Sequence, residues 1–335
     1  MRGLPKSHCG PGLIDLQVNG YAGFSFNGDP AGWTAQQFHH VRSAMARRGV
    51  VAALPTFITD DTALMIARAR KYAEVISGDA ALAAFFPALH IEGPFISPVD
   101  GPRGAHPKFH CKLPEALGDL IDRLRQASGN RIAIVTLAPE LPGALEMIRK
   151  HAAAGICMAI GHTQASASTL DEAVAAGARL STHLGNGSHA LLPRLDNYVQ
   201  HQLADDRLLA TFIADGCHMP LTTLKNFIRA KTPQRSILIT DAVAAAEMPP
   251  GVYELGGEQV ELNLDGRVAK PGAPNLAGSA LTLDRAVIGT HLHCDVTFEQ
   301  AWAMASTIPA SLLGLPAPSN VTVRITEKGF ISQYK

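Results

Sequence analysis

Eight short apolar segments, each ending in polar residues, are the feature of this sequence that most constrains its fold. Parallel strands that are buried on both faces give continuous apolar runs of this kind, and each needs a crossover segment before the next strand. Helical patterns separate the runs, and only the last helix is delayed. The predicted strands cover residues 12–20, 50–59, 85–92, 132–138, 156–162, 179–183, 208–215 and 236–241.

Such alternation predicts an α/β protein, either a closed barrel or an open, doubly wound sheet. The open sheet that binds dinucleotides carries a GxGxxG turn after its first strand, and this sequence has none there. Eight units favour the (β/α)8 TIM barrel, which we place at residues 10–250 and 276–315. The predicted helices cover residues 34–48, 61–77, 114–127, 143–154, 166–176, 196–204, 220–230, 276–290 and 297–313.

Two stretches follow a different pattern. Residues 251–275 alternate polar and apolar side chains between glycine turns, and residues 319–335 alternate like an edge hairpin. We expect a β excursion and a β tail beside the barrel.

Charge and cysteine content restrict partners and compartment. Lys and Arg together number 29, as do Asp and Glu, so no excess charge favours nucleic acid or an anionic membrane. The five cysteines show no CxxC spacing, which is typical of a reducing compartment. No apolar run approaches the roughly 18 residues that span a bilayer. We expect a soluble, cytoplasmic protein.

The ends of the predicted strands carry polar side chains, and a barrel gathers its catalytic groups there. A lone glutamate behind a buried strand is costly unless a cation or hydrogen-bond donors satisfy it, so Glu92 needs a partner. With His162 and His183 it offers the ligands of a Zn²⁺ or Fe²⁺ site. The strand-end residues are Gln17, Asn19, Glu92, His162, His183, Asp215, His218 and Asp241.

Simpler roles exist for these residues one at a time. Each histidine could be a hydrogen-bonded strand end, and Asp241 could cap a helix. Because several such groups end different strands of one barrel, a shared site is the favoured interpretation.

Motifs over nearly the whole chain resemble those of the N-acetylglucosamine-6-phosphate deacetylase family, within the amidohydrolase superfamily. The resemblance implies a hydrolase that converts N-acetylglucosamine 6-phosphate to glucosamine 6-phosphate and acetate. One alternative is a related amidohydrolase acting on an unphosphorylated N-acyl amino sugar or another small N-acyl compound. The motifs are IDLQVNG, LHIEGPFI, RGAHP, VTLAPE, GHT, THLGN, ADGCH, ITDA, LAGSALTLDRAV and MASTIPASLLGL.

A further alternative is a barrel without catalytic activity that binds a sugar phosphate as a sensor. It is disfavoured because a pure binder has no use for a base, Asp241, beside a metal.

The resemblance also implies roles for single residues. Glu92, His162 and His183 match the metal ligands, and Asp241 matches the catalytic acid and base. His106, in the RGAHP loop, matches the histidine that polarises the acyl carbonyl.

Further matches concern the substrate. His218 matches a residue that contacts the sugar, and Asn186 and Gly187 fall where the family binds phosphate. Arg194 matches an arginine that reaches the phosphate of a neighbouring subunit, which implies a homodimer. His189 is expected at the surface or on a helix, although it is close enough in sequence to Asn186 to line the same pocket.

Gln17 and Asn19 replace the His-x-His motif with which many amidohydrolases hold a second metal. Neutral amides are poor ligands for Zn²⁺ beside imidazoles. We therefore expect one divalent metal per subunit, Zn²⁺ in the first place and Fe²⁺ as the alternative.

Three features depart from the family pattern. Only eleven residues precede Gly12, so the family's small β-sandwich is expected to be reduced to residues 251–275 and 319–335. Gly187 and Ser188 replace the Ala-Met that usually follows the phosphate-loop asparagine. The segment RGAHPKFH replaces the more usual Asn-Pro after the loop histidine. These changes affect the substrate side of the site and leave the metal chemistry intact.

Overall fold

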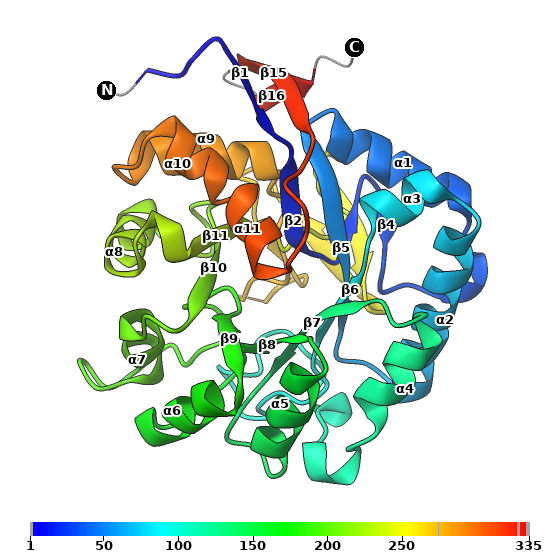
Figure 1. The fold of residues 1–335 in the computed structure, drawn as a ribbon, viewed down its shortest axis with the longest axis vertical. Helices are drawn as coiled ribbons and strands as arrows, with labels where there is room; N and C mark the ends of the chain where they lie inside the picture. Colours follow the sequence, from blue (N-terminus) through cyan, green and yellow to red (C-terminus); the bar gives the residue numbers. More distant parts are fainter. Residues whose placement is uncertain (1–2, 274, 327–328, 333–335) are drawn as a thin grey trace.

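The computed structural model describes residues 3–273, 275–326 and 329–332, and its centre is a parallel eight-stranded barrel inside a ring of helices (Figure 1). Neighbouring strands in the barrel follow one another in the order of the chain. This confirms the predicted fold class. The barrel strands are β2 (Leu13–Val18), β5 (Val50–Ile58), β6 (Leu89–Glu92), β7 (Ile132–Leu137), β8 (Cys157–Ile160), β9 (Ala178–Ser181), β10 (Leu209–Ile213) and β11 (Ser236–Ile239).

The barrel closes where the end of β2 meets the residues after β11. Val18 and Ala242 form a parallel bridge. The Asp241 N–H donates to the Gln17 carbonyl at 3.0 Å, and the Asn19 N–H donates to the Ala242 carbonyl at 2.8 Å. Closure therefore brings Gln17 and Asn19 beside Asp241.

Each barrel strand is followed by an outer helix, and several helices begin at a side-chain cap. Thr34 forms a capping box with Gln37, and Asp61 accepts hydrogen bonds from two N–H groups of the next helix. The outer helices are α1 (Ala35–Ala46), α2 (Thr62–Ser77), α4 (Leu120–Ala127), α5 (Ala144–Ala153), α6 (Ala167–Ala176), α7 (Tyr198–Ala204), α8 (Leu221–Lys231) and α9 (Leu283–His293).

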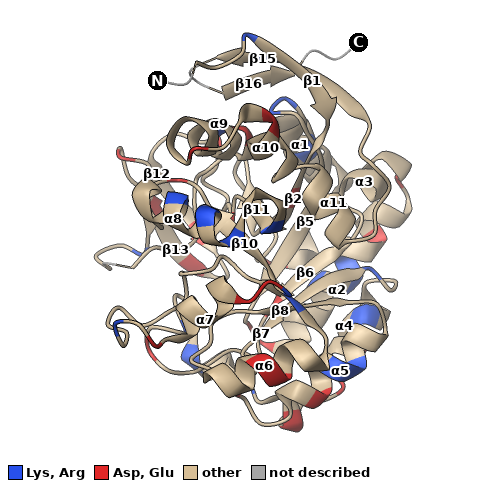
Figure 2. Ribbon diagram, turned by 60° about the vertical axis from the view of Figure 1, so that its left-hand side comes forward, with Lys and Arg blue, Asp and Glu red and all other residues tan. Residues whose placement is uncertain are grey.

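The ribbon carries acidic and basic residues interspersed with one another (Figure 2). Among the described residues, no helix combines the length and the apolar character needed to cross a membrane.

The strand predicted from residue 85 is wrong at its start. Residues 80–85 form helix α3 (Ala80–Phe85), and β6 begins only at Leu89. Asp79 explains the difference, because its side chain accepts from the N–H groups of Ala81 and Leu82 and starts a helix.

The closing helices also differ from the prediction. Helix α9 begins at Leu283 rather than at residue 276, because Leu276 forms a β-bridge with Ala269 and Ser279 forms one with Ala242. Residues 297–313 form two helices, α10 (Phe298–Ala303) and α11 (Thr307–Leu312). The helix predicted from residue 114 begins with a short 3₁₀ turn, and its α-helical part starts at Leu120.

Two small antiparallel sheets accompany the barrel. The tail forms the expected hairpin, to which the N-terminal segment adds a strand that the sequence did not predict. The β excursion follows β11. That both sheets are what is left of one sandwich stays a prediction. The sheets consist of β1 (Ser7–Pro11), β15 (Asn320–Thr326) and β16 (Gly329–Ser332), and of β12 (Gly251–Leu255), β13 (Glu258–Leu262) and β14 (Val268–Ala269).

Shorter elements complete the described chain. They are the ribbon of β3 (Gly20–Tyr21) and β4 (Phe24–Ser25) and the 3₁₀ turns Pro30–Gly32, Lys108–His110, Pro114–Ala116 and Pro233–Arg235.

A polar layer lies inside the barrel, one side-chain layer below Glu92. The two ring nitrogens of His90 contact the Leu16 carbonyl at 3.0 Å and the Thr136 hydroxyl at 2.8 Å. Thr136 in turn contacts the Thr182 hydroxyl at 2.7 Å. Burial lowers the pKa of His90 to about 4, so the ring is neutral at pH 7. These bonds tie together the strands that carry the site.

Asp15 provides a second tie, at the closure of the barrel. It is fully buried, and burial raises its pKa to about 7. The Thr240 hydroxyl donates to Asp15 Oδ2 at 2.6 Å, and the Thr240 N–H donates to Asp15 Oδ1 at 3.2 Å.

We predict that Thr240→Val lowers the free energy of unfolding by about 1–3 kcal/mol, because it leaves buried hydrogen-bonding groups without partners. Urea denaturation monitored by circular dichroism measures the change. Thr322→Val, on an exposed position of β15, is the matched control and should change stability by less than about 0.5 kcal/mol. Equal effects of the two substitutions would contradict the role given to the Asp15–Thr240 bond.

Candidate metal centre and active site

The candidate site lies at the carboxyl ends of the barrel strands. Glu92 is the last residue of β6, whereas His162, His183 and Asp241 each stand two residues beyond a strand. All three of the latter have positive φ angles, of 52°, 30° and 50° respectively. Residues other than glycine rarely adopt this conformation, and such strain concentrates at functional sites. At each of these three residues the main chain changes direction at the mouth of the barrel.

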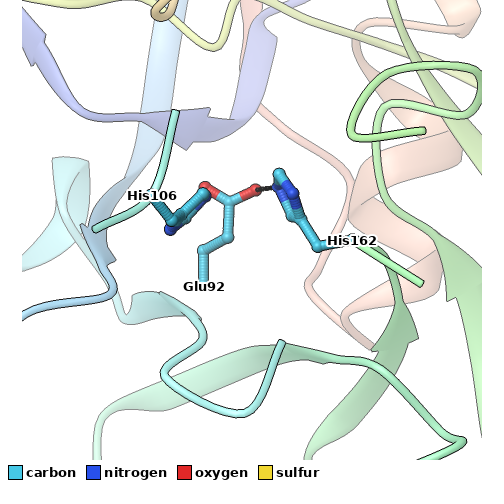
Figure 3. A group of neighbouring side chains, drawn as sticks. All are labelled: Glu92, His106 and His162. Carbon is cyan, nitrogen blue, oxygen red and sulfur yellow. Dashed lines mark hydrogen bonds and ion pairs between the residues drawn. The ribbon is translucent and has the colours of Figure 1, made fainter. Parts of the chain in front are cut away.

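Glu92 is the centre of the cluster. The residue is 2% exposed, and its Oε1 lies 2.8 Å from His183 Nε2 and 3.2 Å from His162 Nε2. Figure 3 shows its carboxylate between His106 and His162. Although burial opposes ionisation, the two facing imidazoles hold the pKa of the Glu92 carboxyl well below its usual range.

The tautomer of His162 indicates what the cluster requires. His162 Nδ1 lies 2.8 Å from the Pro102 carbonyl oxygen, which can only accept, so this nitrogen carries a proton. In the neutral ring, Nε2 then presents a lone pair to Glu92 Oε1. A lone pair facing a carboxylate needs a cation between them.

Protonation of both imidazole rings, of His162 and of His183, would be one way to place positive charge beside the Glu92 carboxylate. However, the rings of His162 and His183 have centroids only 4.9 Å apart, and two imidazolium charges at that distance repel each other. The buried Nδ1 of His183 has no hydrogen-bond partner among the described residues. Two imidazoles and one carboxylate, with the outer nitrogen of one ring held by a carbonyl, fit a divalent metal.

His106 lies within reach of the same centre. Ligand atoms of Glu92, His106 and His162 all lie within 4.8 Å of one another. The ring of His106 meets that of His162 edge-on, with centroids 4.4 Å apart. Burial lowers the pKa of His106 to about 3, so its imidazole is neutral at pH 7.

Gln17 and Asn19 donate hydrogen bonds to the acidic groups. Gln17 Nε2 donates to Glu92 Oε1 at 3.1 Å and to Asp241 Oδ1 at 3.0 Å. Asn19 Nδ2 donates to the same Asp241 oxygen at 2.6 Å. Burial, with the negative charge of Glu92 as a second cause, raises the pKa of Asp241 to about 6. Asp241 is thus suited to exchange a proton near neutral pH.

The cluster opens into a cavity of about 990 Å³. The cavity lining includes Asn186, Gly187 and His218, which the sequence placed on the substrate side, and also His189, for which a surface position was expected. The Asp215 carboxylate orients His218, because its Oδ2 lies 2.7 Å from His218 Nδ1. Lining residues that sequence reasoning missed include Thr59, Arg103, Leu255, Glu258 and Lys270.

Arg194 lies apart from this cavity. It is exposed in the loop between β9 and α7, and the cavity lining of its own subunit does not include it. Its neighbours Leu191 and Leu195 are 91% and 82% exposed. The structure therefore brings together every predicted site residue except Arg194. Gln17 does not line the cavity, but it donates hydrogen bonds to Glu92 and Asp241.

Comparison with known proteins decides the family. The model of the amidohydrolase family matches residues 10–319. The chain belongs to the amidohydrolase family. Within this family, the hydrolase is similar to curated N-acetylglucosamine-6-phosphate deacetylases. It is 34% identical to the one from Danio rerio over 321 residues and 36% identical to the one from Homo sapiens over 322 residues, covering 91% of this chain and 75% and 74% of those proteins.

Two further proteins similar to this amidohydrolase are deacetylases named for amino-sugar phosphates. It is 34% identical over 313 residues to an N-acetylgalactosamine-6-phosphate deacetylase from a Shewanella species, covering 91% of this chain and 74% of the relative. It also superposes on a variant of N-acetyl-D-glucosamine-6-phosphate deacetylase from Mycobacterium smegmatis, solved in complex with N-acetyl-D-glucosamine-6-phosphate, with a TM-score of 0.86 and 26% identity, covering 97% and 84% of the two chains. The resemblance found in the motifs is confirmed.

Gly187 permits the close approach of the β9–α7 loop to His162. A Cβ at this position would lie 2.5 Å from His162 Nδ1, and the backbone has a positive φ of 57°. We predict that Gly187→Ala displaces the ring and weakens binding of Zn²⁺ by about tenfold or more. Competition with a chromophoric chelator measures the dissociation constant.

Gly129→Ala is the matched control for this prediction. Gly129 has a similar positive φ of 68°, but a Cβ there would meet no atom within 4 Å. The control should keep the affinity of the unsubstituted protein within about twofold. Equal metal affinity in both variants would show that the ring of His162 does not depend on Gly187.

Proposed function

We propose that the chain is a single-metal deacetylase that converts N-acetylglucosamine 6-phosphate to glucosamine 6-phosphate and acetate. The observation that carries the proposal is the convergence of Glu92, His162, His183 and Asp241 at the mouth of an amidohydrolase barrel. Curated relatives that are 34–36% identical carry this activity in their names.

Glu92, His162 and His183 would hold one divalent metal, Zn²⁺ or alternatively Fe²⁺. When bound, such a metal activates a water molecule and polarises an amide carbonyl. Gln17 and Asn19 donate their amide N–H groups to Glu92 and Asp241 and so orient these carboxylates. Neutral amides are also poor ligands for Zn²⁺ beside imidazoles. This arrangement supports one metal per subunit.

Asp241 would act as the base and then as the acid. Its carboxylate accepts a proton from the attacking water and returns it to the leaving amine, because an amine is expelled only as it becomes protonated. Hydrogen bonds from Gln17 and Asn19 fix Oδ1, which leaves Oδ2 for the proton.

His106 would polarise the acyl carbonyl. The neutral ring can offer one N–H, and its buried Nδ1 has no partner among the described residues. A donor held near the developing oxyanion favours the tetrahedral transition state. The cavity-lining residues Asn186, Gly187 and His218 would contact the sugar phosphate.

N-Acetylgalactosamine 6-phosphate is a second candidate substrate. The relatives named for that sugar are 33–34% identical to this chain, nearly as similar as those named for the glucosamine sugar. The two hexosamines differ only in the orientation of one hydroxyl. A related unphosphorylated N-acyl amino sugar is the remaining alternative.

The proposal includes a cytoplasmic homodimer. Arg194 is exposed outside its own cavity between two highly exposed leucines, which suits a residue that reaches a neighbouring subunit. All five cysteines are free thiols, as expected in a reducing compartment.

Replacing the base tests the chemistry. We predict that Asp241→Asn lowers kcat for deacetylation by about 10²- to 10⁴-fold, because the amide cannot accept a proton. Bound metal should remain near one equivalent by elemental analysis. Asp171→Asn, on the exposed surface of α6, is the control and should leave kcat unchanged. An unchanged rate in Asp241→Asn would remove this residue from the mechanism.

Replacing Arg194 tests the dimer. We predict that Arg194→Ala raises KM for the phosphorylated sugar by about tenfold or more, since a charge-assisted hydrogen bond is lost. Hydrolysis of the unphosphorylated sugar should not change.

Mixing the two variants gives the sharper test of that prediction. An Asp241→Asn subunit still offers Arg194 to its neighbour, and an Arg194→Ala subunit keeps Asp241. Mixed dimers should therefore regain activity at low substrate concentration. Failure to regain activity in dimers proven to be mixed would contradict a role across the interface.

A further inference from the structure

The loop between β6 and α4 carries His106, and a single side chain ties that loop together. We propose that Arg103 is a positioning residue that holds His106 over the reacting amide. The inference rests on the proposed function, because it adds a residue to that reaction.

The guanidinium of Arg103 joins two points of the loop. Nη1 donates to the main-chain carbonyl of His106 at 2.6 Å, and Nη2 donates to Asp100 Oδ1 at 2.5 Å. The Arg103 N–H also donates to the Val99 carbonyl at 2.9 Å. One side chain thus spans the turn from residue 100 to residue 106.

The hydrogen-bonded side chain of Arg103, here called the clamp, lies in the loop between Pro102 and His106, which both contact His162. The residue before Arg103, Pro102, accepts the Nδ1 proton of His162, and His106 packs its ring on the same histidine. The neighbouring Ala105 carbonyl accepts only a longer bond of 3.4 Å, from Lys270. The bond from Arg103 to the His106 carbonyl is therefore much shorter than the bond from Lys270 to the neighbouring carbonyl.

The loop needs the hydrogen bonds of Arg103 because its glycines give the backbone high conformational freedom. Gly101 and Gly104 have positive φ angles of 96° and 59°, and glycine has the greatest backbone freedom of all residues. The planar fork of arginine presents two separate nitrogens at fixed positions to a carbonyl and a carboxylate, whereas a lysine ammonium donates from a single nitrogen.

The competing explanation is that Arg103 and Asp100 form an ordinary surface ion pair without a role in the site. Asp100 is 82% exposed, so its pairing with Arg103 contributes little stability by itself. The bond to the His106 carbonyl distinguishes Arg103, because it fixes the main chain of a residue in the site. Positioning errors of about 1 Å at such a residue lower rates strongly.

A double-mutant cycle with His106→Asn tests whether Arg103 acts through His106. Arg103→Ala should lower kcat about tenfold while KM stays within twofold. In the His106→Asn background, the same change should alter kcat by less than twofold. Added guanidinium should partly restore Arg103→Ala, and Arg103→Lys should recover little activity.

Limited proteolysis measures the clamp without any activity. Phe109, in the same loop, is 83% exposed and open to chymotrypsin once the loop loosens. Arg103→Ala should speed cleavage after Phe109 about tenfold. Arg149→Ala, which breaks an exposed pair with Glu146 on α5, is the control and should leave the cleavage rate unchanged.

The outcomes separate the two proposals. A protein without deacetylase activity would overturn the proposed function, whereas proteolysis would still report on the clamp. Unchanged kcat and cleavage in Arg103→Ala would overturn the positioning role. A raised KM, or an equal loss of kcat in the His106→Asn background, would also overturn it, since Arg103 would then act on the substrate or on the fold.

Discussion

The buried carboxylate of Glu92 is the group on which the rest of the site depends. It faces the imidazoles of His162 and His183 at hydrogen-bonding distance, and the residue is only 2% exposed. Because the outer nitrogen of His162 donates to Pro102, the inner nitrogen of the neutral ring would face the carboxylate with a lone pair. The positive φ angles at the strand ends and the amide of Gln17 all serve to assemble this cluster.

Much of the barrel could be predicted from the sequence, because strands buried on both faces leave unbroken apolar runs. The errors lie where other interactions decide. Asp79 caps a helix that extends to Phe85, the first residue of the run that was assigned to one strand. Residues 276–282 have a helical composition, but Leu276 forms a β-bridge with Ala269 and Ser279 forms one with Ala242, and helical composition does not record such pairing.

The site could be predicted in part. Glu92, His162, His183 and Asp241 were recognisable because each closes a strand run, and the structure places them around one cavity. The hydrogen bonds of Gln17 and Asn19 depend on closure of the barrel, which only the folded chain shows. Arg103 was missed because its partner is a main-chain carbonyl, which leaves no trace in residue type.

The most direct test of the account is acetate release by protein of known metal content. N-Acetylglucosamine 6-phosphate, its galactosamine epimer and unphosphorylated N-acetylglucosamine should be compared at equal concentration. The account predicts about one metal per chain, loss of activity with its removal, and acetate release from N-acetylglucosamine 6-phosphate alone or well above release from the other two sugars. Undiminished release after complete removal of the metal would contradict it.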